Sequence, residues 1–95
     1  MPLRDNEGRP FPIGEYVRTR EELLARFEAI SFEPGPVQGT WIHKQIRYED
    51  ESARIFVVCE DTASNERFFI EYKEVLKERF EQLEMWITVH PIRIL

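Results

Sequence analysis

Hydrolytic sites use histidine, aspartate and glutamate, and this chain carries a few of these residues where they could converge. His90 lies near the end of the sequence, and Glu60 and Asp61 follow its most apolar stretch. An imidazole can act as a base or a metal ligand, and a carboxylate can hold a divalent cation. Together they could support metal-assisted hydrolysis. The structural interpretation is simpler: a strand-end histidine bonded to backbone, and an acid in the first turn of a helix.

No motif specific to a reaction accompanies these residues. The sequence contains no P-loop, GxGxxG turn, HExxH or GxSxG pattern. Its single cysteine, Cys59, excludes an internal disulfide and a multi-cysteine metal site, and is interpreted as a small buried hydrophobe. We therefore expect no cofactor and no bound metal, and the pattern favours a protein without enzymatic activity.

The composition favours one small domain with an acidic surface. Of the 95 residues, 42% are apolar and 13% aromatic, which is enough for a modest core. The net charge is −5, and no basic stripe is present, so we expect no nucleic-acid partner. The sequence has no export signal and no apolar run of about 18 residues, so we expect a cytoplasmic protein without a membrane partner.

The first elements that must position these residues are an arm and a helix. Residues 1–14 hold three prolines and two glycines, and we expect a flexible N-terminal arm there, followed by a single α/β domain at 15–95. Thr19 and Glu22 have the spacing of a capping box, which predicts a helix that begins at Thr19. Its apolar stripe is Leu23, Leu24, Phe27 and Ile30.

A β-hairpin should follow the first helix. Two strands are predicted, at 37–48 and 52–60, and the acidic residues 49–51 between them form the expected tip. The second strand has apolar side chains on both faces, from Ile55 to Cys59, which indicates a central strand. The tip would place Trp41 opposite Cys59, give or take one position.

The rest of the chain predicts a long helix and a last strand. The apolar spacing indicates a helix over 62–83 capped by Thr62, with Asp61 as the alternative cap. The final segment, from Met85, favours a strand parallel to the central one, and Pro91 makes it an edge strand.

The fold class is therefore α+β: a two-layer α/β sandwich, α-β-β-α-β, with a three-stranded mixed sheet and both helices on one face. A four-stranded ferredoxin-like sheet would result if Phe11–Val17 added a strand.

This topology would gather polar side chains at the carboxyl ends of the parallel strands, where ligands tend to bind in such sheets. The positive end of the long helix lies there too and favours an anion. We call this candidate ligand site the rim. Its residues are Trp41, Glu60, Asp61, Thr62 and His90.

Three further residues are candidates for an interface. Phe56 and Val58 point away from the face that carries Ile55 and Val57, so helices on one face would leave them uncovered. Arg79 lies near the apolar arc of the long helix. Its stem either snorkels over the core edge, or its guanidinium pairs with a carboxylate from the sheet or a second subunit.

Three hypotheses of function result. The leading one is a small acidic protein-interaction or regulatory module, a homodimer or a module bound to another protein. The alternative is a small metal-assisted hydrolase or phosphoesterase, with His90 as base or ligand and Asp61 or Glu60 as the metal-binding acid. An acidic inhibitor that occupies a nucleic-acid site on a basic protein is a third, supported by net charge alone.

Overall fold

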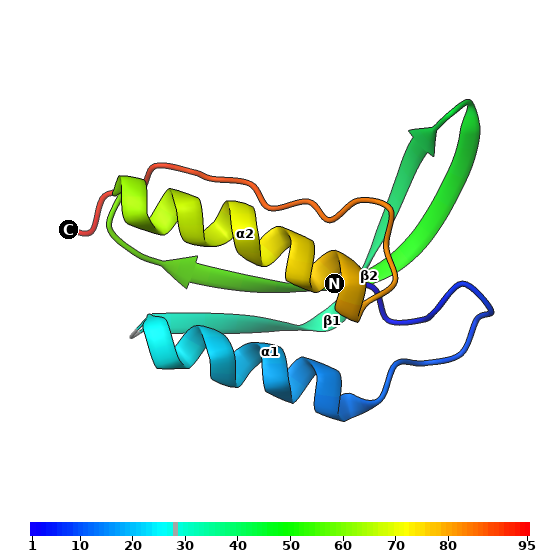
Figure 1. The fold of residues 1–95 in the computed structure, drawn as a ribbon, viewed down its shortest axis with the longest axis horizontal. Coiled ribbons are helices and arrows are strands. Elements are labelled where there is room, and N and C mark those ends of the chain that lie inside the picture. Colours follow the sequence, from blue (N-terminus) through cyan, green and yellow to red (C-terminus); the bar gives the residue numbers. More distant parts are fainter. Residues whose placement is uncertain (28) are drawn as a thin grey trace.

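The computed structural model of the chain contains two helices and two strands (Figure 1). The structure describes residues 1–27 and 29–95, and for 34–39, 41–43 and 48–51 it describes the backbone only. The fold is of the mixed α+β class, as the sequence predicts. Its elements are α1 (Ile13–Arg26), β1 (Ala29–His43), β2 (Ile46–Val58) and α2 (Ala63–Arg79).

Helix α1 begins six residues before the predicted start. It starts at Ile13, directly after Pro12, so the prediction of a start at Thr19 is wrong, and so is the alternative of a strand at Phe11–Val17. Thr19 is a mid-helix residue whose hydroxyl donates to the Glu15 carbonyl at 2.8 Å, so it does not form a capping box. The earlier start is stabilised because Phe11 and Tyr16 pack their rings against Phe80, with centroids 5.3 and 5.2 Å away.

The hairpin is present, but it turns at a different place. Residues Lys44 and Gln45 both have positive φ, 50° and 67°, and join β1 to β2 as a two-residue turn. The acidic residues predicted as the tip lie within β2, and Trp41 pairs with Tyr48, so the predicted pairing with Cys59 is wrong. Two-residue turns of this kind favour Asn-Gly, and Lys-Gln gives no such signal.

Strand β1 starts eight residues earlier than predicted because it includes a proline-rich segment as a bulge. Glu33 pairs with Arg54 and Val37 with Ser52, so three residues of β1 lie opposite the single residue Ala53. Prolines cannot donate to a ladder and are tolerated at such a bulge. The segment 34–36 therefore bends the strand without ending it.

Helix α2 confirms the predicted cap. The Thr62 hydroxyl accepts a hydrogen bond from the backbone N–H of Asn65 at 3.1 Å. The helix ends at Arg79, four residues before the predicted end, and Glu81 follows with a φ of 52°. The tight turn after Phe80 thus redirects the chain earlier than the apolar pattern indicates.

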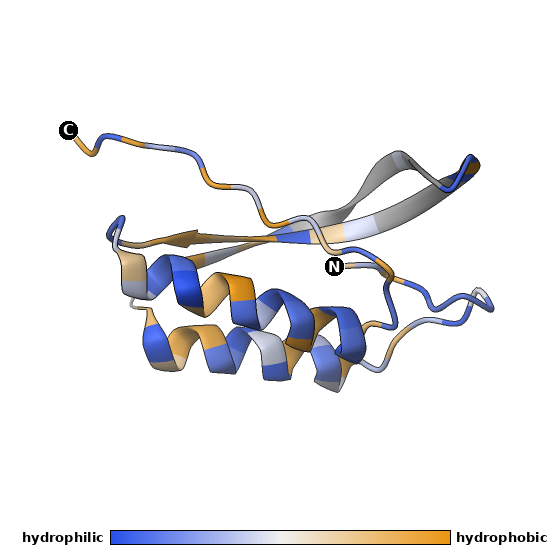
Figure 2. Cartoon of the chain, turned by 45° about the horizontal axis from the view of Figure 1, so that its top comes forward, coloured by the Kyte–Doolittle hydropathy of each residue, from blue (hydrophilic) through white to orange (hydrophobic). Residues whose placement is uncertain are grey.

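The core lies between the helices and one face of the hairpin, and Figure 2 shows both helices on the same side of it. The helices are antiparallel: Arg79 near the end of α2 meets Glu15 near the start of α1, and Arg26 at the end of α1 bonds Ser64 in the first turn of α2. Buried residues that form the core cluster are Leu23, Phe27, Tyr72, Leu76, Phe80 and Met85, with Ile30, Ile55 and Val57 packed against them.

The N-terminal residues contact β2. The Met1 amine donates to the Ala53 carbonyl at 2.7 Å, and the Ala53 N–H donates back to the Met1 carbonyl at 2.6 Å. Pro2 forms an isolated bridge with Ser52, and its carbonyl accepts from the Tyr16 hydroxyl at 2.5 Å. The division into an arm at 1–14 and a domain at 15–95 stays a prediction.

Within the described residues the sheet has two strands, and the segment after α2 forms neither helix nor strand. Both views show this segment running in the same direction as β2 (Figures 1 and 2). The segment has the expected direction, but within the described residues it is not a strand and pairs with none, so the predicted third strand is not confirmed. One physical reason is that Met1 already occupies the outer edge of β2 at Ala53.

Candidate functional site

The Arg79 guanidinium is buried between α1 and α2, with only 4% of its side chain exposed. Its Nη1 lies 2.5 Å from Glu22 Oε1 and donates to Thr19 Oγ1 at 2.8 Å. Its Nε lies 3.8 Å from Glu15 Oε2. Glu15, Thr19 and Glu22 follow one another at i, i+4 and i+7, which places them on one face of α1. One arginine therefore connects three α1 side chains to α2.

Tyr72 completes this polar cluster from the middle of α2. Its hydroxyl lies 3.1 Å from Glu22 Oε1 and 3.4 Å from the Thr19 carbonyl oxygen. Among the residues that the structure describes, no buried side-chain nitrogen or oxygen lacks a hydrogen-bond partner. The cluster is therefore fully satisfied, which is the condition under which buried polar groups stabilise a fold.

The electrostatics of the cluster favour an ion pair. The hydrogen bond from Arg79 lowers the pKa of Glu22, partial burial opposes this shift, and the Tyr72 hydroxyl adds to it, so the pKa lies below its ordinary value. Burial raises the pKa of the Tyr72 phenol, and the Glu22 carboxylate raises it further. Glu22 stays ionised and Tyr72 neutral at pH 7, so neither is tuned as an acid or base near neutral pH.

Sequence reasoning singled out Arg79 but missed its partners. The carboxylates come from α1 of the same chain, not from the sheet or a second subunit, and the interface role of Arg79 stays a prediction. The signal that could have found them is the spacing of Glu15, Thr19 and Glu22 beside the apolar stripe, which a helix starting at Thr19 would conceal.

Three residues of the rim lie together at the start of α2. The Glu60 carbonyl accepts from the Asn65 side-chain amide at 2.8 Å and from the Thr62 N–H at 3.0 Å. Asp61 is exposed, as is the neighbouring Cys59, so the interpretation of Cys59 as a buried hydrophobe is wrong. This local geometry is that of a helix cap.

The other two rim residues lie elsewhere. Trp41 pairs with Tyr48 near the hairpin turn, at the opposite end of the ladder from Val58, and its side chain lies outside the described residues. His90 is exposed in the segment after α2, where its Nε2 lies 2.9 Å from the Thr88 hydroxyl. The structure does not bring Trp41 to Glu60 and Asp61, and the ligand-binding role of the rim stays a prediction.

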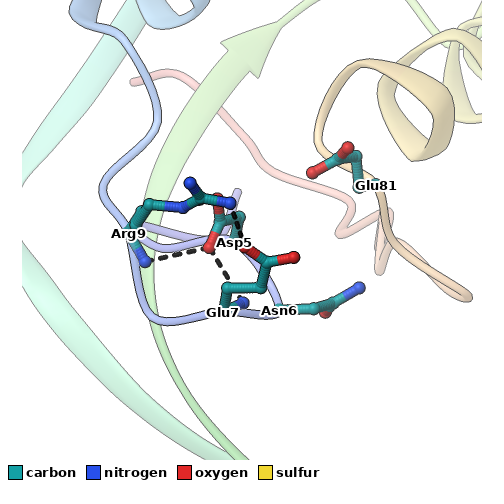
Figure 3. A pocket seen from close by; sticks show the side chains of 5 residues that line it. All are labelled: Asp5, Asn6, Glu7, Arg9 and Glu81. Atoms are coloured by element: carbon teal, nitrogen blue, oxygen red, sulfur yellow. Dashed lines mark hydrogen bonds and ion pairs between the residues drawn. The ribbon is translucent and has the colours of Figure 1, made fainter.

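A small hollow lies between the N-terminal loop and the turn after α2 (Figure 3). Its volume is about 210 Å³, below the 300–1,000 Å³ typical of ligand pockets. Asp5 organises the loop: its Oδ1 accepts from the N–H groups of Glu7 and Arg9, each at 2.9 Å, and Arg9 forms ion pairs with both acids. Glu81 stands across the hollow from this loop. The bonds within the loop account for its geometry without a ligand.

The face of the hairpin turned away from the helices carries apolar side chains. Phe56 and Val58 are 52% and 45% exposed, whereas Ile55 and Val57 pack against the core. Arg54 and Glu33 form a cross-strand ion pair beside them, with Nε and Oε2 3.2 Å apart. We call this surface, made of Phe56, Val58, Arg54 and Glu33, the outer face.

The segment after α2 adds a second exposed apolar region. Met85 is buried and Ile87 packs against the core, but Trp86 and the residues after Ile87 are exposed to solvent. Such a density of exposed apolar residues is typical of interaction surfaces. The exposed members are Trp86, Val89, Ile92, Ile94 and Leu95, at 65% or more.

Comparisons with protein-family models, with curated proteins and with solved structures find no match to this chain. Within the described residues, no group of three or more His, Cys, Asp or Glu side chains is placed to hold a metal ion. In the same part of the chain, neither helix has the length and apolar character needed to cross a membrane. The outer face and the C-terminal segment are thus the features that a function must explain.

Proposed function

We propose that this chain is a protein-interaction or regulatory module without catalytic activity, which works as a homo-oligomer, most simply a homodimer. The observation that carries the proposal is the uncovered outer face. Phe56 and Val58 are about half exposed there, and among the described residues both helices lie on one side of the hairpin, where Ile55 and Val57 pack against the core. Large exposed aromatic and aliphatic side chains cost solvation free energy and usually mark a contact with a partner.

The charge pattern supports a second copy as that partner. The outer face carries one positive and one negative side chain, Arg54 and Glu33, next to its apolar residues. In a twofold arrangement each copy presents the same patch, so Arg54 of one copy can approach Glu33 of the other. The charges of the patch can therefore pair between two copies, and its apolar side chains can pack against each other because hydrophobic contact is not directional.

The finer fold belongs to this proposal. The three-stranded mixed sheet and two-layer α/β sandwich are the form that the chain takes in the assembly, with the segment after α2 as the third strand. The absence of a nucleic-acid partner is part of the same proposal and is supported by the net charge of −5. A cytoplasmic location and the absence of a membrane partner belong to it as well. Among the described residues, no observation favours the hydrolase alternative.

Light scattering tests the proposal directly. We expect a mass of about twice 11.4 kDa at micromolar concentration and a decrease towards 11.4 kDa on dilution. Phe56→Ser should shift the mass towards the monomer, because it removes the largest apolar group of the outer face. Ile70→Ser is the matched control: Ile70 is 63% exposed on α2, on the helix side of the sheet, and its loss should leave the mass unchanged. A mass of 11.4 kDa for the unmodified protein at all concentrations would refute the proposal.

A further inference from the structure

At its outer edge, strand β2 is hydrogen-bonded to Met1 through Ala53. Backbone groups of successive residues in a strand point to opposite sides. Ala53 directs its N–H and C=O away from β1, to Met1, so Ile55 and Val57 direct theirs to the same outer edge. Within the described residues no hydrogen bond reaches the outward groups of Ile55 or Val57. Beyond Ala53, this edge is therefore an unoccupied acceptor for another strand.

The same chain contains a segment suited to that edge. Residues Thr88–Leu95 lack helix and strand structure, and their backbone groups make no hydrogen bond to other elements within the described residues. The side chains of Val89, Ile92 and Ile94 are 82%, 65% and 81% exposed. β-branched residues such as these favour a pleated surface. An exposed donor strand and an open acceptor edge thus coexist in one chain.

Side-chain direction and the proline agree with this pairing. Met85 and Ile87 pack inward, so in an extended strand the residues of even number, such as Ile92, would turn to the outer face. In a parallel ladder the even-numbered residues then direct their backbone groups in one direction and Pro91 in the other. Because Pro91 has no N–H, it fits the side away from β2. Ile92 and Ile94 would then extend the apolar outer face beside Phe56 and Val58.

The charges at the end of β2 are compatible with a parallel pairing. Arg93 is the one cationic Lys or Arg side chain between Met85 and Leu95, and β2 is followed by Glu60 and Asp61. A strand parallel to β2 brings Arg93 to the end of β2 that carries these acids.

The donor strand has to come from a second copy. Met85 and Ile87 are held on their own core, and Figure 2 shows the chain beyond them departing from its own hairpin. Met1 also occupies the β2 edge at Ala53, where the segment would have to enter its own sheet. A twofold pair in which each copy supplies one strand and accepts one satisfies both edges and closes the assembly.

We propose that two copies of this chain exchange residues Thr88–Leu95, each segment pairing in parallel with the β2 edge of the other copy at Ile55 and Val57. The inference rests on the proposed homodimer and names the segment through which it forms. The exchange also completes the third strand of each sheet.

Two proline substitutions test the exchange. Ile92→Pro removes an N–H that the ladder requires, and we expect it to raise the dimer dissociation constant by about tenfold or more. Val89→Pro is the matched control: it also replaces an exposed β-branched residue, but its N–H points away from β2, as that of Pro91 would. Well below the dimer dissociation constant, the circular dichroism of both variants should match that of the unmodified protein, because neither residue is buried in the single chain.

Labelled copies identify the donor. In a mixed dimer of isotope-labelled and unlabelled protein, we expect intermolecular nuclear Overhauser effects between Ile92 methyl groups and the Ile55 and Val57 amides. Contacts found only within one copy would overturn the exchange. A dimer that both proline variants leave intact would overturn it too, while leaving the proposed function standing. A protein that is monomeric throughout would overturn both.

Discussion

The interface between α1 and α2 and the segment after α2 place opposite kinds of side chain in opposite environments. The interface buries an arginine, a threonine and a tyrosine, and pairs them with one another and with two carboxylates. The segment leaves Trp86, Val89 and Ile94 in water. Among the described residues, every buried polar side-chain atom between the helices has a hydrogen-bond partner. In the segment after α2, by contrast, large apolar side chains are mostly exposed to solvent.

The largest expected effect is the loss of the Arg79 charge. Arg79→Met keeps the length of the stem but leaves Glu15, Glu22 and Thr19 without their shared donor. A fully buried pair broken in this way costs about 3–5 kcal/mol; here the carboxylates are partly exposed, and we expect about 2–3 kcal/mol. Urea denaturation measures the change. Arg67→Met, on the exposed side of α2, is the control and should cost no more than about 0.5 kcal/mol. A comparable loss in both variants would contradict the role assigned to the cluster.

The second effect is a dependence of stability on acid. The pKa of Glu22 is lowered in the folded protein, chiefly by the hydrogen bond from Arg79, so its contribution to stability is present above the unfolded pKa, ordinarily about 4.3. That contribution is lost as the pH falls through the lower folded pKa. Because 39% of the Glu22 side chain is exposed, we expect a discounted effect of about 1 kcal/mol.

Glu22→Gln isolates this contribution. Thermal unfolding followed between pH 6 and about pH 2 should show a smaller loss of stability in the variant, because glutamine does not titrate. Glu21→Gln is the neighbouring control, since Glu21 pairs only with the exposed Arg20 and should leave the pH profile unchanged. Identical profiles for the unmodified protein and Glu22→Gln would mean that another carboxylate dominates acid unfolding.

The smallest effect is expected in the C-terminal segment. Ile94→Ser should change the free energy of unfolding of the dilute monomer by no more than about 0.5 kcal/mol, because the side chain is 81% exposed. Chemical denaturation well below the dimer dissociation constant provides the measurement. A loss of about 2 kcal/mol there would show that the segment packs on its own chain, and the contrast between the two regions would disappear.

The sequence was sufficient where local chemistry determines the structure. Thr62 followed by a strong apolar period predicts the start of α2, and the two-residue period of a strand places Phe56 and Val58 on the face opposite Ile55 and Val57. It failed where tertiary contacts override local signals. Thr19 and Glu22 have the spacing of a capping box, but their partners in the structure lie on α2, far along the chain. The Lys44–Gln45 turn has positive φ at both residues, without the glycine or asparagine that usually indicates such a turn.

For the candidate site the limit was of the same kind. The prediction that Phe56 and Val58 point away from the core needs only the two-residue period of a strand, and their exposure agrees with it. The predicted contact between Trp41 and Glu60 depended on the position of the hairpin turn. Because the turn lies at Lys44–Gln45 and not at 49–51, every pairing along the ladder is shifted. A site assembled from several elements inherits the error of each one.

The separation of Arg79 from its α1 partners along the chain has a kinetic consequence. Its contact with Thr19 spans 60 residues, whereas the hairpin joins strands that follow one another. Because closing a long loop is entropically costly, we expect the hairpin to form early and α1 to dock on α2 after the folding barrier. Contacts that are absent from the transition state act on the unfolding rate. We therefore expect Arg79 to lower the unfolding rate of the chain more than it raises the folding rate.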